Sequence, residues 1–263
     1  MSDIFDAINP LNLAIAKSII GGGGQVEIVS WADGTPAQLA AMLFANDAGL
    51  IDINDYWSVG DERTEHLSAI AANPNGAFTT AMDAQDVVMV IMNEGYMNQP
   101  GIHFVVGQKD VLNRDGRMNA TRTNTGSWKD SLMRADLNNL YYNAFSADFR
   151  ALFKSFGVLT AQTGDGSINE TVQDYFALFA EKEVFGAAEL SNATEAAALS
   201  QIEYYKTSAN RVKKCGRYKK VWAERSPVGI SDPTTSFCAV SGAGKEYWQG
   251  GHETTSISPF GCI

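Results

Sequence analysis

The expected fold depends on two segments near the C-terminal end of the chain, WAERSP at residues 222–227 and SPFGCI at residues 258–263. Between them lies the strand-like run FCAVS at residues 237–241, followed by a glycine-rich turn. Chain ends are usually polar and frayed, whereas this end carries Phe260, Cys262 and Ile263. We therefore expect the last residues to form a buried strand around which the upstream chain folds.

The composition is that of a globular protein with one large or two small domains. The chain has 263 residues, of which 45% are hydrophobic and 19% charged, and a chain of this length buries a core without disulfide support. Its three cysteines are an odd number and lack Cys-x-x-Cys spacing, which argues against a zinc ribbon and a disulfide framework. Cys238 and Cys262 lie in apolar, strand-like surroundings, so we expect them to be buried free thiols; Cys215 is the third.

The charge balance argues against nucleic acid and anionic membranes as partners. The formal net charge is −10, and an acidic protein repels both kinds of surface. One basic run, residues 211–220, contains six Lys or Arg in ten positions and is either an anion-binding patch or a solvated connector. No basic leader and no apolar run of about 20 residues occurs, so we expect the protein to be made in a cytoplasm, to stay soluble and not to insert into a membrane.

The N-terminal residues are expected to form a separate unit. An apolar stripe with helical spacing runs along residues 1–20 and is followed by four glycines at 21–24. The stripe consists of Ile4, Ile8, Leu11, Ile15 and Ile19. A helix of this length is marginal alone in water, so the stripe should pack on other copies of the chain or on another protein. We expect residues 1–24 to be an anchor and hinge, residues 25–263 to be one domain, and the protein to be a homo-oligomer, by preference a trimer.

Local patterns indicate an α+β fold. The clearest signal is a helix after Thr35, because Thr35, Pro36 and Gln38 supply an N-cap, a first-turn proline and a capping box. We expect strands over residues 26–29, 87–92, 104–107 and 172–179, a strand, turn and strand over 56–61, and helices over 129–144, 146–156 and 195–208.

The sequence contains no convincing catalytic or metal-binding pattern. Its histidines, His66, His103 and His252, are far apart and lack a metal-ligand spacing, so we expect no metal and no cofactor. A group of carboxylates beside Trp57 has two interpretations. They form a glycosidase-like acid pair, or they shape a turn in which Asp61 pairs with Arg63 or Arg225. The group consists of Asp52, Asp55, Asp61 and Glu62.

Three motifs resemble the C-type-lectin-like fold, in particular its sulfatase-modifying-factor-like and phage variable-protein branches: WAERSP at residues 222–227, the hairpin Phe-x-x-Val-x-x-x-Gly at 237–244 and the ending SPFGCI at 258–263. With WSVGDER at 57–63 and MNATRTNTGSW at 118–128 upstream of WAERSP, the chain resembles more closely a domain common in gut Firmicutes and their phages. The resemblance covers roughly residues 30–263 and implies a C-type-lectin-like domain behind a short helical anchor. It implies a set of scaffold residues: Trp57, Asp61, Arg63, Trp128, Trp222 and Arg225.

The resemblance implies binding or assembly more than catalysis. A formylglycine-generating enzyme needs a close pair of cysteines near the C-terminus, and a calcium-dependent lectin needs Glu-Pro-Asn or Gln-Pro-Asp; neither occurs here. We expect contact loops carrying Tyr247, Trp248 and His252 among glycines. The implied protein is a phage virion protein, either a capsid decoration or head fibre, or a tail accessory that binds a host-surface glycan or protein. It would join other virion proteins through residues 1–20.

The alternative is a carbohydrate-active or modifying enzyme. Such an enzyme would place Asp55, Asp61 and Arg225 together in a cleft.

Overall fold

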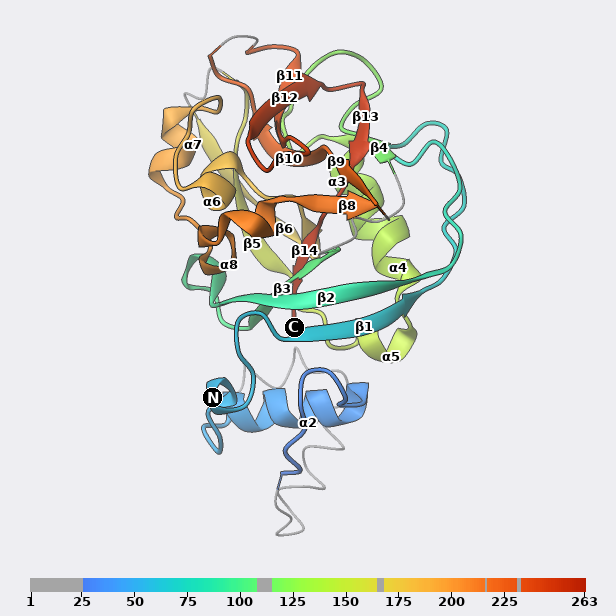
Figure 1. Ribbon diagram of the computed structural model, residues 1–263, viewed down its shortest axis with the longest axis vertical. Helices are drawn as coiled ribbons and strands as arrows, with labels where there is room; N and C mark the ends of the chain where they lie inside the picture. The colour runs from blue at the N-terminus through green and yellow to red at the C-terminus, as the bar shows by residue number, and fades with distance from the viewer. Residues whose placement is uncertain (1–25, 108–114, 165–167, 216, 231–232) are drawn as a thin grey trace.

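The structure is a computed structural model that describes residues 26–107, 115–164, 168–215, 217–230 and 233–263 (Figure 1). It mixes α-helices and β-strands, as expected for an α+β fold, with most of the regular structure in sheets. The helices are α2 (Pro36–Asp47), α3 (Leu132–Asp136), α4 (Tyr142–Ala144), α5 (Ala147–Arg150), α6 (Glu181–Phe185), α7 (Ala193–Ala197) and α8 (Glu203–Lys206), with 3-10 turns η1 (Ile53–Asp55), η2 (Tyr96–Asn98) and η4 (Ser208–Arg211) and the π-helical turn η3 (Leu137–Tyr141). The strands are β1 (Glu62–Leu67), β2 (Gln85–Glu94), β3 (Ile102–Val106), β4 (Asp115–Arg117), β5 (Phe156–Ala161), β6 (Asn169–Asp174), β7 (Phe176–Ala177), β8 (Lys213–Cys215), β9 (Tyr218–Lys220), β10 (Trp222–Pro227), β11 (Ser236–Val240), β12 (Glu246–Gly250), β13 (Thr254–Ser256) and β14 (Phe260–Cys262).

The first sheet has the strand order β1-β2-β3-β14-β7. Its long strand β2 contains the β-branched run that predicted a central strand, and β3 confirms the strand expected over residues 104–107. β14 lies inside this sheet, antiparallel to β3 and to β7, with Phe260 opposite Val105 and Ala177. Phe260, Cys262 and Ile263 are fully buried. The expectation of a buried C-terminal strand is confirmed.

The second sheet has the order β12-β11-β10-β13-β4. Its central strand β10 is the segment WAERSP, which pairs antiparallel with β11 and parallel with β13. The register between β10 and β11 shifts between Ala223 and Pro227, so β10 bulges around Glu224 and Arg225. β12 is an edge strand of this sheet, joined to the sheet through β11.

Helix α2 begins as the sequence predicts. The Thr35 side chain accepts from the Gln38 amide, and the Gln38 side chain accepts from the Thr35 amide. The helix ends at Asp47, and Gly49 adopts a φ of 68° that favours glycine. In Figure 1 α2 lies at the opposite end of the molecule from the second sheet. The cap and the glycine therefore fix both ends of a helix that contacts α5 and η1 and buries Leu39 and Met42 in the core.

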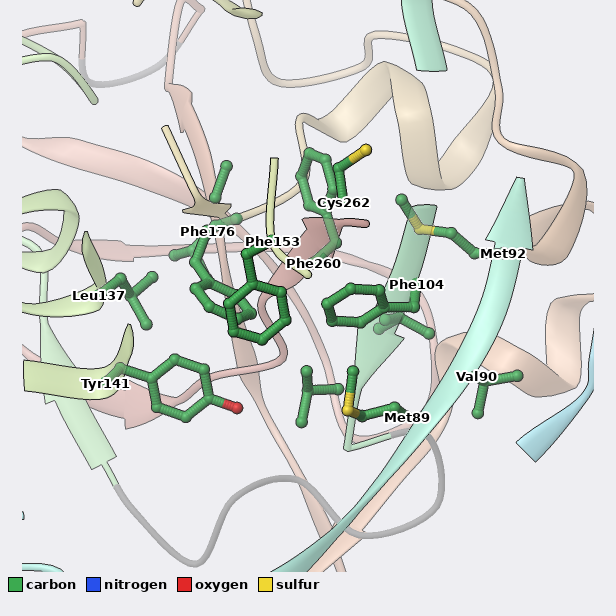
Figure 2. Close-up of a cluster of buried hydrophobic side chains, with 14 of the residues drawn as sticks. Met89, Val90, Met92, Phe104, Leu137, Tyr141, Phe153, Phe176, Phe260 and Cys262 are labelled. Carbon is green, nitrogen blue, oxygen red and sulfur yellow. The ribbon is translucent and has the colours of Figure 1, made fainter. Parts of the chain in front are cut away.

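An aromatic cluster fills the interior beside the first sheet (Figure 2). Phe153 and Phe176 meet edge to face at 5.0 Å, and Tyr141 meets Phe176 at the same separation. Phe104, from β3, joins them at 6.1 Å from Phe176. Edge-to-face pairs add about 0.5–1.5 kcal/mol each beyond the burial of their area, so this cluster ties η3 and the segment after α5 to both β3 and β7.

The helix expected over residues 129–144 is shorter and is not a regular α-helix. It begins at Leu132, because the Ser131 side chain accepts from the Arg134 amide and caps it. Its middle widens into η3, a π-helical turn. The Asn138 side chain in this turn accepts from the amides of Tyr175 and Phe176, so the turn makes a tertiary contact with the chain between β6 and β7.

Asn138 also explains why residues 172–179 are not one strand. Its side-chain oxygen accepts hydrogen bonds from the amides of Tyr175 and Phe176 at 2.6 and 3.1 Å, and the chain bends at Tyr175 between β6 and β7. The predicted helix over 146–156 is also wrong beyond its first turn. Ser146 caps it as expected, but α5 ends at Arg150 and β5 begins at Phe156.

Three other local expectations are wrong. Residues 26–29 form no strand, and residues 56–61 form turns after η1 because Asp52 and Asp61 bond nearby amides. The helix expected over 195–208 is split into α7 and α8. At the break, the Ile202 amide donates to the Glu183 carbonyl instead of continuing a helix. Ile202 and Tyr205 point inward as expected, but Ala209 is exposed.

The expected anchor and hinge, residues 1–24, lie outside the described residues, and so does the stripe from Ile4 to Ile19. In the part of the chain that is described, no helix is long and apolar enough to cross a membrane.

Candidate functional site

Arg225 lies at the centre of the polar interior. It is fully buried, and its five N–H groups all donate. Nε donates to the Leu159 carbonyl at 3.1 Å, Nη1 to the Leu178 carbonyl and to Glu183, and Nη2 to the Tyr96 hydroxyl and to Glu183. The guanidinium therefore has no donor left for a ligand.

Glu183, on α6, is the carboxylate that neutralises Arg225. Its oxygens lie 2.6 and 2.8 Å from Nη1 and Nη2, and they also accept from the Ala180 amide and the Tyr96 hydroxyl. The prediction that a buried Arg225 needs a carboxylate is confirmed, but the choice of Asp61 as that partner is wrong. Asp61 instead accepts from the Ser58 amide at 2.9 Å, because turn chemistry holds it within its own loop.

The expected scaffold residues are buried, except that Asp61 is half-buried. Arg63 donates to Glu65 and to the carbonyls of Trp31 and Gly34. Its carboxylate partner is therefore Glu65 and not Asp61. Each of the three tryptophans in this set donates its indole N–H to a nearby acceptor. Trp57 bonds the Val29 carbonyl, Trp128 bonds Asp174 and Trp222 bonds the Arg211 carbonyl.

The carboxylate group near Trp57 does not form a cleft with Arg225. Asp52 accepts from the Asn54 amide, and Asp55 and Glu62 are exposed. Arg225 bonds Glu183 and Tyr96 instead. The enzyme-like arrangement of Asp55, Asp61 and Arg225 is therefore not present.

The histidines also lie apart in the fold. His103 is fully buried beside Tyr96, and burial lowers its pKa to about 4. His66 bonds Asp86 at the surface, and His252 is exposed. Over the described part of the chain, no group of three or more His, Cys, Asp or Glu side chains is arranged to hold a metal ion.

A hollow of about 290 Å³ opens beside the Arg225 centre. The loop 95–98 forms one wall, and residues 198–202 form the other. Met97 and Asn98 adopt φ angles of 49° and 61°, a backbone conformation that residues other than glycine rarely adopt. Tyr96 and Glu183, which also line this hollow, already bond Arg225, so they have few hydrogen-bonding groups left for a ligand.

Tyr247 and Trp248, which were expected on a contact loop, lie on strand β12 instead. Tyr247 is 48% exposed and Trp248 41%. Tyr247 lies opposite Ala239 on β11, and Trp248 lies opposite Cys238. Because the two residues are successive on the strand, their rings point to opposite faces of the sheet. His252 follows on the turn after β12, with its ring against Gly250.

The basic run contains a residue that the sequence did not reveal. Lys213 is fully buried, although the run was expected to be either an anion patch or a solvated connector. Its ammonium donates to the Gly107 carbonyl and lies 5.3 Å from the Trp222 ring centre. Burial lowers the pKa of Lys213 to about 7. Nothing in its sequence context distinguishes it from the exposed lysines around it.

Both cysteines that were expected to be buried free thiols, Cys238 and Cys262, are free and buried. Burial raises the pKa of Cys262 to about 12, so its thiol is neutral at ordinary pH. These sulfur atoms are structural in character.

One family model matches the chain, the domain of unknown function DUF6273, over residues 101–262. This range begins at the edge of β3 and reaches the end of β14, two strands that pair with each other, and it contains β10 to β12. α2, β1 and β2 precede it. No curated protein and no solved structure matches the chain.

Proposed function

The chain belongs to the DUF6273 family, and we propose that this member is a binding protein displayed on the surface of a phage virion. In this proposal residues 25–263 form one C-type-lectin-like domain, and the edge strand β12 with its following turn is the contact surface. The virion setting and the lectin-like fold rest on the sequence motifs, and residues 1–20 would join the domain to other virion proteins.

The observation that carries the binding role is the exposure of three successive residues on β12. Glu246, Tyr247 and Trp248 are all exposed, although successive side chains on a strand point to opposite faces. Both faces of the strand are therefore open to solvent there. Aromatic residues contribute large contact areas at a small entropic cost, and the outer edge of a strand can accept an extended partner.

Arg225 has no N–H donor left for a substrate, which also favours a binding role over the alternative enzyme. All five N–H groups of Arg225 are used within the protein. Asp61 holds the Ser58 amide. Two of the three residues that the alternative enzyme requires, Asp61 and Arg225, are therefore committed to structure.

The direct test measures binding of the purified protein to host cells and to isolated host-surface glycans. We expect the double variant Tyr247→Ser, Trp248→Ser to lose at least about tenfold in affinity, because aromatic anchors dominate contact energies. The control is Tyr218→Ser, which removes a ring that is 61% exposed on β9. Equal binding by the double variant and the control would reject β12 as the contact surface, and absence of the protein from purified particles would reject the virion setting.

A further inference from the structure

The short helix α6 contacts β10, and the short helix α7 contacts β5 (Figure 1). Four glutamate side chains are buried in this region. Each is at most 1% exposed. Glu181 and Glu183 belong to α6, Glu195 to α7 and Glu224 to β10. Isolated carboxylates are strongly disfavoured in such surroundings unless they are neutralised or hydrogen-bonded.

Three of the four have partners that account for their burial. Glu183 pairs with Arg225. Glu181 accepts from the amides of residues 189–191 at 2.7–3.2 Å and so closes the loop after α6. Glu195 accepts from the Ala161 amide at 3.1 Å, which joins α7 to β5.

Glu224 differs from the other three. Neither of its side-chain oxygens has a hydrogen-bond partner among the described residues. Arg225, the next residue, cannot supply one, because its five donors are already used. An ionised carboxylate here would be neither solvated nor neutralised.

The surroundings of Glu224 favour its neutral form from every side. Burial raises the pKa of Glu224 well above its ordinary value, and the nearby carboxylates of Glu181, Glu183, Glu195 and Glu246 raise it further. Two other titratable groups face the same region, Cys238 from β11 and Tyr205 from α8. Burial raises the pKa of both, so they too remain neutral at ordinary pH.

We propose that Glu224 controls, by binding a proton, how α6 packs on β10 and α7 on β5; these two helices are called the cover. The protonated side chain permits the closed arrangement, and its ionisation favours an opened cover. Opening supplies the water that an ionised carboxylate requires. The cover is held to β10 and its extension by the Glu183–Arg225 ion pair and by two further hydrogen bonds. The Glu181 amide donates to the Ser226 hydroxyl at 3.2 Å, and the Gly229 amide to the Leu190 carbonyl at 2.8 Å.

The sign of the pH effect follows from the direction of the shift. Between the pKa of an unfolded glutamate, about 4.3, and the higher value in the native state, the native state binds the extra proton. The contribution of Glu224 to stability is thus fully present below about pH 4.3 and is lost as pH rises through its folded-state pKa. Within that window the folded-to-unfolded ratio falls by up to about tenfold per pH unit.

The test compares the wild-type protein with Glu224→Gln over about pH 4–9, by denaturant unfolding and by amide hydrogen exchange. Gln keeps the size of the protonated side chain and cannot ionise. We expect the wild type and Glu224→Gln to be similar near pH 4. The ratio of their folding constants should then grow in favour of Gln, up to about tenfold per pH unit. Amides of residues 181–199 should exchange faster in the wild type than in Glu224→Gln at high pH.

The control is Glu203→Gln, which removes an exposed carboxylate from α8, and its difference from the wild type should not change with pH in this window. A constant difference between wild type and Glu224→Gln across the pH range would overturn the proposal. So would a pH-dependent difference in which exchange of residues 181–199 stays unchanged, because ionisation would then not open the cover. Glu224→Met serves as a second non-ionisable variant, and it should show the same loss of pH dependence.

Discussion

Arg225 and Glu183 form a bidentate ion pair that solvent does not reach. The two N–O distances are 2.6 and 2.8 Å, and the side chains are 0% and 1% exposed. The pair joins β10 to α6, and the remaining Arg225 donors extend it to the carbonyls of Leu159 and Leu178. One side chain thus connects the second sheet with α6, β5 and the chain leading from β7.

Replacing Glu183 by Gln should destabilise the protein by about 3–5 kcal/mol, because the buried guanidinium would lose its counter-charge. Chemical denaturation at neutral pH measures this change. Glu203→Gln, at a carboxylate that is exposed on α8, should change the free energy of unfolding by no more than about 0.5 kcal/mol. A Glu183→Gln protein as stable as the wild type would show that the pair is not needed for the fold.

The buried Lys213 predicts a stability that rises with pH. An unfolded lysine keeps its proton to about pH 10.4, while the folded protein releases it near pH 7. Between these values the unfolded state binds more protons, so this group adds up to about 1.4 kcal/mol of stability per pH unit. Lys213→Met should be more stable than the wild type at pH 6, and its advantage should shrink steadily up to pH 10. An advantage that is independent of pH would contradict a neutral Lys213 in the folded protein.

Removing residues 259–263 should prevent folding. Phe260 and Ile263 are fully buried, and burial of each contributes roughly 1.5–3 kcal/mol to a total of about 5–15 kcal/mol. The truncation also removes β14 from between β3 and β7. Circular dichroism melting is the measurement, and a truncated chain that melts cooperatively near the temperature of the parent would contradict the prediction.

Deleting residues 1–24 should leave the domain folded and abolish assembly. The predicted apolar stripe lies in that segment and needs a second surface to cover it. We expect melting to change little, while light scattering reports the loss of homo-oligomers. Particle incorporation should be lost in parallel. Normal assembly of the deleted form, or unfolding of its domain, would show that the segment belongs to the core.

Local sequence signals predicted the elements whose causes are local. The capping box of Thr35 and Gln38, the strand around residues 87–92 and the cap at Ser146 each depend on neighbours within a few positions. The sequence also showed that Arg225 requires a carboxylate. It could not show that the carboxylate is Glu183, because 42 residues separate the two and α6 is a short helix with no distinctive pattern.

The wrong assignments have long-range causes. Asn138 bends the chain at Tyr175, and the Glu183 carbonyl holds Ile202 where a helix was expected. The burial of Glu224 was missed for the same reason. A glutamate beside an arginine is typical of a solvated strand face, and only the cover from α6 and α7 makes it an interior residue.

The position of β14 has a consequence for how the protein is made. Residues 103–105 pair with residues 260–262, so this edge of β3 stays open until residues 260–262 have left the ribosome. Such an edge, lined by the buried run from Ile102 to Val106, is a template for wrong strand pairing. Folding that waits for a distant strand is slow. During translation the growing chain should therefore depend on chaperones that shield β3 until its last neighbour arrives.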